Sequence, residues 1–288
     1  MKKWVFCFVI LVSLLFGYGV RETKLNADNE IQLNEGKQAQ EASSSMSELH
    51  IDADQIYKGD LLLVNKDHPV HPESEETGAV NLSEHLELVN GFRLLDNEIE
   101  LSPSLARKFA DMVKAAKNDG VSHFIVNSGY RNHEEQNQLY AEKGADYALP
   151  AGYSEHNLGL SLDIGSTQAE MSQALEGKWL KKNAWRYGFI LRYPEDKTAV
   201  TGIEFEPWHF RYVGLPHSAV MEKKNFALEE YLDYLKDKKQ ITITIDDEIY
   251  EISYYPITGD TTIPVPAKGG YELSGNNKDG VIVTTQIK

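Results

Sequence analysis

Apolar side chains recur every three or four positions in several stretches of the chain, and this spacing predicts amphipathic helices. The clearest stretch is 103–119, where Ser102 precedes Pro103 and Gly120 follows, as at the start and end of many helices. The expected buried face of this helix consists of Leu105, Phe109, Met112 and Val113.

Three further helices are predicted at 132–144, 167–188 and 225–238. The first two begin with capping pairs, in which an N-cap side chain and a glutamate three residues later satisfy each other's backbone N–H groups. These pairs are Asn132 with Glu135 and Thr167 with Glu170. The apolar face of the last helix consists of Leu228, Tyr231, Leu232 and Leu235.

Short apolar and aromatic runs between these helices predict strands. They lie at 61–64, 123–130, 189–194 and 206–214. After Lys239 the pattern becomes an alternation of apolar and polar residues, which predicts a small β domain over 240–288. Helices and strands mixed without a regular βαβ rhythm favour an α+β fold over a doubly wound sheet.

The N-terminal residues 1–20 do not look like part of the fold. Two lysines precede an apolar run over 4–20, which is typical of a secretion signal, and no clear cleavage site follows it. A cleaved signal peptide and an uncleaved membrane anchor both fit this pattern. Residues 21–50 are polar and predict a flexible tether, so the main domain is expected at 51–237.

Composition narrows the class of protein. The chain of 288 residues is 41% hydrophobic, with a formal net charge of -15, which argues against nucleic-acid binding. Cys7, the only cysteine, lies inside the N-terminal apolar run, so the exported part has no disulfide. We expect a monomeric bacterial protein that is exported to the outer face of the cytoplasmic membrane or to the cell wall.

Candidate metal ligands are spread over two separate stretches. His156 and Asp163 lie seven residues apart, and Gly159 between them allows a bend. The second stretch, 202–210, holds Glu206 three residues before His209. Zinc accepts histidine nitrogen and carboxylate oxygen, and a nearby glutamate can take a proton from water. A core histidine and a surface glutamate remain the alternative.

Strand geometry alone would put Glu206 and His209 on opposite faces, because they are three positions apart. Pro207 disfavours a regular strand there, so a bend could turn both side chains inward. Glu204 competes with Glu206 for the role of base. The histidines of the exposed loop, His68 and His71, and those expected at the surface, including His217, receive no functional role.

A third stretch, 128–136, places Arg131 at a strand-to-helix turn and Gln136 in the helix that follows. Arginine binds carboxylates with paired hydrogen bonds, and a free peptide C-terminus is such a carboxylate. The alternative is an ion pair with Glu134 or Glu135.

These three stretches together resemble the motifs of one family. The segments "SGYRNHEEQ", "SEHNLGLSLD" and "EPWHFRYVG" are similar to those of the VanY-type D-alanyl-D-alanine carboxypeptidases, in the metallopeptidase group that also holds lysostaphin-type enzymes and hedgehog. The resemblance implies a small antiparallel sheet with flanking helices. It implies a zinc D,D-carboxypeptidase that removes the C-terminal D-alanine from peptidoglycan stem peptides.

The resemblance also implies a role for each motif residue. His156, Asp163 and His209 would bind zinc, and Glu206 would be the catalytic base toward the zinc-bound water. Arg131, Gln136 and Ser154 would bind the substrate's terminal carboxylate and last peptide unit. Ser161 stands where the family often has alanine.

Other functions remain open at this point. The same motifs serve L,D-carboxypeptidases that act on tetrapeptide stems, and a non-enzymatic zinc-containing wall-binding module is a further alternative. Glu206 and Arg131 together favour an enzyme, because one supports hydrolysis and the other binds a free chain end. A carboxylate-binding arginine also argues against an endopeptidase.

Overall fold

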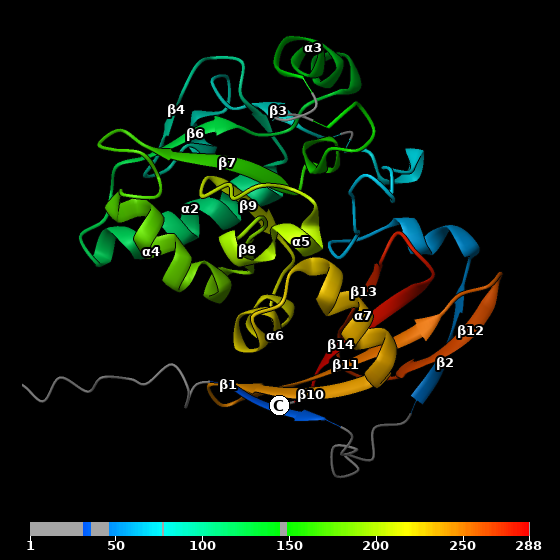
Figure 1. Cartoon of the computed structure of the whole chain (residues 1–288). Helices are drawn as coiled ribbons and strands as arrows, with labels where there is room; N and C mark the ends of the chain where they lie inside the picture. The colour runs from blue at the N-terminus through cyan, green and yellow to red at the C-terminus, as the bar shows by residue number, and fades with distance from the viewer. Residues whose placement is uncertain (1–30, 36–45, 77, 145–148, 288) are drawn as a thin grey trace, which may run out of the picture.

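A computed structural model of the protein describes residues 31–35, 46–76, 78–144 and 149–287 (Figure 1). The predicted signal or anchor at 1–20 lies outside these residues. Within the described part of the chain, no helix has the length and apolar character needed to cross a membrane.

The first half of the molecule is built on a five-stranded sheet with helices around it (Figure 1). All neighbouring strands are antiparallel except β4 and β6. The sheet order is β4 (Arg93–Leu94), β6 (Phe124–Ser128), β7 (Ser161–Ser166), β9 (His209–Tyr212) and β8 (Phe189–Leu191). A two-stranded sheet joins β3 (Val80–Asn81) to β5 (Glu100–Leu101). The mixed α and β character and the small, largely antiparallel sheet confirm the predicted fold class.

The helices differ in how well local sequence defines them. They are α2 (Pro103–Asn118), α3 (His133–Lys143), α4 (Leu175–Asn183), α5 (Thr198–Thr201), α6 (His217–Lys224) and α7 (Leu228–Lys238). Short 3-10 turns are η1 (Ala53–Tyr57), η2 (Pro72–Ser74), η3 (Leu86–Leu88), η4 (Glu155–Leu158), η5 (Ala184–Tyr187) and η6 (Glu195–Lys197). The capped helices α2 and α3 begin where predicted, since Ser102 and Asn132 accept backbone N–H groups of their first turns.

The first core lies between the sheet and α2. Phe109 on α2 is fully buried and packs near Phe124 of β6, with ring centroids 6.5 Å apart. Leu162 and Ile164 of β7 and Phe210 of β9 complete this layer. The core therefore fixes β7 and β9 side by side.

The second half contains another five-stranded sheet, which packs against helices α6 and α7 (Figure 1). Its order is β1 (Ile31–Glu35), β10 (Gln240–Ile245), β11 (Glu248–Pro256), β14 (Gly280–Gln286) and β13 (Tyr271–Gly275). A hairpin-like pair, β12 (Thr261–Pro266) with β2 (Met46–Ile51), covers its other face. The C-terminal segment is therefore β-rich as predicted, and it shares a core with α6 and α7, which precede it in the chain.

The predicted tether at 21–50 is wrong for two of its stretches. Residues 31–35 form β1, which pairs with β10, and Met46–Ile51 form β2, which pairs with β12. Ile31 and Ile51 are almost completely buried. The polar sequence of these stretches did not predict strands, because an edge strand needs few apolar residues when its backbone pairs with a neighbouring strand.

Two other predicted elements differ from the structure. The run 61–64 is buried but is not a strand, because its backbone bonds to side chains and loops: Leu63 N–H donates to the Asn276 carbonyl. The helix predicted at 167–188 begins only at Leu175. The Thr167 N–H donates to the His123 carbonyl, and residues 167–174 form bends and turns before the helix.

His217 is also buried and not at the surface, as the sequence suggested. Its Nδ1 lies 2.6 Å from the Tyr231 hydroxyl on α7, and its Nε2 lies 3.0 Å from Thr284 Oγ1 on β14. The ring thus joins α6, α7 and the second sheet through hydrogen bonds. Burial lowers its pKa to about 3, because the charged form would lose its hydration.

This histidine should make the fold acid-sensitive. The pKa of His217 is about 3 in the folded protein and near 6.5 in the unfolded chain. The neutral ring therefore contributes fully to the free energy of unfolding above ~pH 6.5, and this contribution is lost as pH falls toward 3. We expect wild type to lose more thermal stability than His217→Gln between about pH 7.5 and pH 5. Equal losses in the two proteins would contradict this expectation.

Candidate active site

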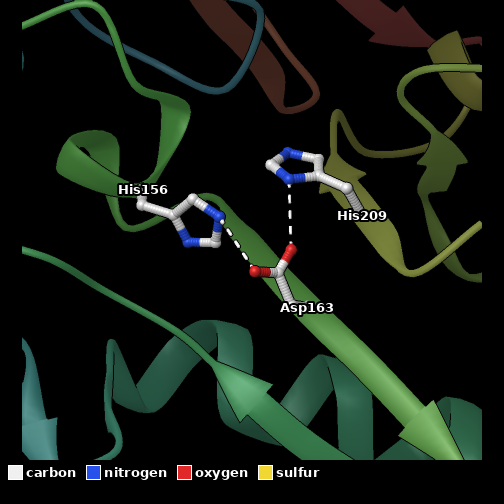
Figure 2. Close-up of side chains that lie close together, drawn as sticks. All are labelled: His156, Asp163 and His209. Carbon is white, nitrogen blue, oxygen red and sulfur yellow. Dashed lines mark ion pairs between the residues drawn. The ribbon is translucent and has the colours of Figure 1, made fainter. Parts of the chain in front are cut away.

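Two histidines and an aspartate from separate elements meet in one place (Figure 2). His156 lies on η4, Asp163 on β7 and His209 on β9. Asp163 and His209 are direct partners in the β7–β9 ladder. Gly159 ends η4 with a left-handed φ of 65°, and this turn returns the chain to β7 so that His156 lies beside Asp163.

The two rings point toward the two oxygens of the aspartate (Figure 2). His156 Nε2 lies 3.5 Å from Asp163 Oδ2, and His209 Nδ1 lies 3.2 Å from Asp163 Oδ1. On its other side, His156 Nδ1 lies 2.6 Å from the Gly129 carbonyl oxygen. A carbonyl oxygen only accepts, so Nδ1 carries the proton and Nε2 keeps a lone pair toward the centre.

This arrangement fits a metal ion. The three ligand atoms all lie within 4.8 Å of one another. Among the described residues, the buried Asp163 Oδ1 has no hydrogen-bond partner, although His209 Nδ1 lies 3.2 Å away. Burial opposes ionisation of Asp163, but His156 and His209 hold its pKa well below the usual value. Two nitrogens and an ionised oxygen are a donor set that zinc accepts.

Glu206 lies at the edge of this cluster. Pro207 and Trp208 form a turn, in which His209 N–H donates to the Glu206 carbonyl at 3.2 Å. The bend predicted at Pro207 is present, and it places Glu206 Oε2 3.8 Å from His209 Nδ1. Burial raises the pKa of Glu206 to about 7, with nearby carboxylates adding to the rise and His209 opposing it. A carboxyl with such a pKa can take and return protons near neutral pH.

The predicted substrate-binding residues line the same cavity of about 170 Å³. Arg131 donates from Nη1 to Gln136 Oε1 and from Nη2 to Ser128 Oγ, both at 2.7 Å. Within the described residues it forms no ion pair with Glu134 or Glu135. Ser154 Oγ accepts the His156 N–H at 3.3 Å.

All seven predicted site residues therefore line one cavity. Glu204, the alternative base, is exposed and is not among the residues that line it. The structure leaves Glu204 outside the site.

Sequence reasoning missed a buried ionic cluster beneath the site. Glu155, Arg192 and Arg211 have side chains with no solvent exposure. Arg192 pairs with Glu155 on one side and with Glu229 of α7 on the other. Burial opposes ionisation of Glu155, but the two arginines hold its pKa well below the usual value. Each residue alone looks like an ordinary surface charge in the sequence, and only the family-like "SEH" segment pointed near Glu155.

A pair of histidines and an aspartate beside a mostly buried glutamate is an arrangement suited to a hydrolase that activates water. Residues 98–215 match the family model VanY, described as D-alanyl-D-alanine carboxypeptidase. A D-alanyl-D-alanine carboxypeptidase of Enterococcus faecium is 53% identical over 291 residues, which cover 99% of this chain and 96% of that protein.

Two solved structures are similar to this one. The D,D-dipeptidase VanXYg, in complex with a D-Ala-D-Ala phosphinate analog, has 31% identity and a TM-score of 0.73, with 84% of this chain and 99% of that chain covered. A mutant of the D,D-pentapeptidase VanY from a VanB-type resistance cassette, in complex with Zn(II), has 33% identity and a TM-score of 0.50, with 60% and 98% covered.

The chain belongs to the VanY family of D-alanyl-D-alanine carboxypeptidases. It is therefore a carboxypeptidase, a hydrolase, and not a non-enzymatic binding module.

The buried cluster gives a stability prediction. Replacing Arg192 with methionine leaves Glu155 and Glu229 short of a buried cation, and such a loss costs about 3–5 kcal/mol. Urea unfolding at neutral pH measures it. The control is Lys236→Met, which removes an exposed ion pair with Asp279 and should have no measurable effect. An Arg192→Met protein as stable as this control would show that the arginine does not compensate the buried carboxylates.

Proposed function

We propose that this carboxypeptidase is zinc-dependent and removes the C-terminal D-alanine from peptidoglycan stem peptides. The observation that carries the proposal is one cavity that combines the His156–Asp163–His209 cluster with Glu206 and Arg131. Zinc and a D-Ala-D-Ala analog are bound by the similar solved structures, which supports both parts of the proposal.

The metal would be held by His156 Nε2, His209 Nδ1 and the Asp163 carboxylate. Zinc bound at such a set lowers the pKa of water and polarises a carbonyl group. The remaining chemistry belongs to side chains of this chain.

Arg131 is suited to bind the free carboxylate of the last residue. A guanidinium has five N–H donors, and Gln136 and Ser128 use two of those of Arg131. The remaining donors can form a paired hydrogen bond with a carboxylate. Gln136 and Ser128 also hold the guanidinium in place, and the Ser154 hydroxyl hydrogen can be donated to the last peptide carbonyl.

Glu206 would move the proton during hydrolysis. Its carboxylate takes a proton from the attacking water and then donates it to the nitrogen of the leaving D-alanine. The pKa of about 7 lets one side chain perform both steps near neutral pH. The requirement for a terminal carboxylate at Arg131 makes this an exopeptidase.

We further propose that the enzyme is a monomer at the outer face of the cytoplasmic membrane or in the cell wall. The basic and apolar residues at 1–20 and the location of peptidoglycan outside the membrane support this placement.

Replacement of Glu206 tests the mechanism. Glu206→Gln should lower kcat by about 10²–10⁴-fold, because a neutral amide cannot accept the proton. Its zinc content should stay that of wild type, since His156, Asp163 and His209 are unchanged. Glu204→Gln is the control and should retain full activity, because Glu204 does not line the cavity. A Glu206→Gln enzyme with wild-type activity would contradict the assignment of Glu206 as the catalytic base.

Product analysis tests the substrate. Purified protein is incubated with pentapeptide and tetrapeptide stems, with and without a chelator, and the products are weighed by mass spectrometry. We expect release of free D-alanine from the pentapeptide, no cleavage of the tetrapeptide, and recovery of activity on adding zinc after chelation. Cleavage of the tetrapeptide instead would identify an L,D-carboxypeptidase, whose motifs are the same.

A further inference from the structure

Glu155, the residue before His156, makes a set of contacts that the proposed mechanism does not use. Its Oε1 accepts from Arg192 Nε and from Arg211 Nη1, both at 2.8 Å. Its Oε2 accepts from Ser161 Oγ at 3.1 Å and lies 3.4 Å from His209 Nε2. The carboxylate therefore uses one oxygen for the two guanidinium groups and the other for the metal-side histidine.

These contacts decide which nitrogen of His209 carries a proton. A carboxylate between two guanidinium groups is ionised and can only accept hydrogen bonds. His209 must then donate from Nε2, so the neutral ring keeps its lone pair on Nδ1. Nδ1 is the nitrogen that lies toward Asp163 Oδ1 and Glu206 Oε2.

We propose that Glu155 is a positioning residue, which holds His209 in the tautomer that offers Nδ1 to a metal ion. The inference rests on the proposed metal dependence and adds to it a requirement outside the ligand set. A residue that orients a ligating histidine typically changes metal affinity by about 10–100-fold when it is replaced.

The carboxylate is itself held in a fixed orientation. Arg192 forms a double hydrogen bond with Glu229 of α7, at 2.7 and 2.9 Å. Arg211 donates from Nη2 to the carbonyl oxygens of Asp60 and Leu62, each at 2.9 Å. The two guanidinium groups are thus anchored by different segments of the chain, and each donates to the Oε1 position of residue 155.

This anchoring makes Glu155→Gln informative, although it hardly changes the volume of the side chain. The arginines require the amide oxygen at the Oε1 position, which leaves the amide NH₂ at the Oε2 position, facing His209. An NH₂ group only donates, so Nε2 would have to accept and Nδ1 would have to carry the proton. A protonated Nδ1 cannot bind a metal ion.

The experiment combines metal affinity with a direct reading of the ring. Zinc affinity is measured by competition with a chelator, and ¹⁵N-histidine NMR spectra in the presence of zinc locate the ring protons of His209. In wild type we expect one bound zinc, with the proton on Nε2. In Glu155→Gln we expect at least about 10-fold weaker zinc binding and a proton on Nδ1.

The matched control is Glu176→Gln. Glu176 is another almost fully buried glutamate, which accepts from Ser166 Oγ at 2.7 Å and from the His123 N–H at 3.2 Å. It does not line the cavity of the site. Its replacement should leave zinc affinity and the His209 tautomer unchanged, which separates positioning from a general effect of a buried neutral amide.

Three outcomes would overturn the inference. Wild-type affinity in Glu155→Gln with the proton still on Nε2 would show that Glu155 does not set the tautomer. Zinc bound through His209 Nε2 in wild type would also contradict the inference. This measurement needs no variant, so the inference can be tested even if Glu155→Gln does not fold. A wild-type protein that binds no zinc would instead refute the proposed metal dependence, and the inference with it.

Discussion

The structure depends on one ionised carboxylate, that of Glu155, which is shielded from water. Glu155 has no solvent exposure, and ionised groups are stable in such surroundings only when their charge is compensated and their hydrogen bonds are satisfied. Two arginines from the segment after β8 and from β9 supply that compensation. Because Arg192 also binds Glu229 of α7, this charge compensation involves both the sheet that contains β7 and β9 and the helix that leads into the second sheet.

The same electrostatics set the properties of the site above it. Carboxylates of Glu155, Asp163 and Glu206 gather around His209, so the groups cannot all keep ordinary pKa values. Asp163, between two histidines, stays ionised, whereas Glu206, buried near the other carboxylates, has a pKa of about 7. The environment thereby shifts the pKa values of two carboxyl groups in opposite directions, as the proposed roles of a metal ligand and a proton carrier require.

The two halves of the molecule are joined by the segment 60–65 as well as by α7. Arg211 of β9, in the first sheet, binds the Asp60 and Leu62 carbonyls. Asn277 of the β13–β14 turn, in the second sheet, binds the Leu63 carbonyl. Within the described residues, 61–64 pair with no strand, and the backbone groups of 60–63 bond instead to side chains and to the Asn276 carbonyl. That explains why an apolar run resembling a strand is a buried connection instead.

Local patterns in the sequence were enough to predict α2, α3 and the β-rich C-terminus, because caps and periodic apolar positions act within a few residues. The motif residues His156, Asp163, Glu206 and His209 could also be chosen from the sequence, through a family resemblance and not through spacing. Tertiary structure alone decided the rest. β1 and β2 exist because strands far along the chain offer them backbone partners, and His217 is buried because three elements close around it. In the sequence, Glu155 shows no feature beyond its place between Ser154 and His156. Its buried charge is compensated by arginines 37 and 56 residues away. Charge compensation acts through space, so no local pattern could reveal it.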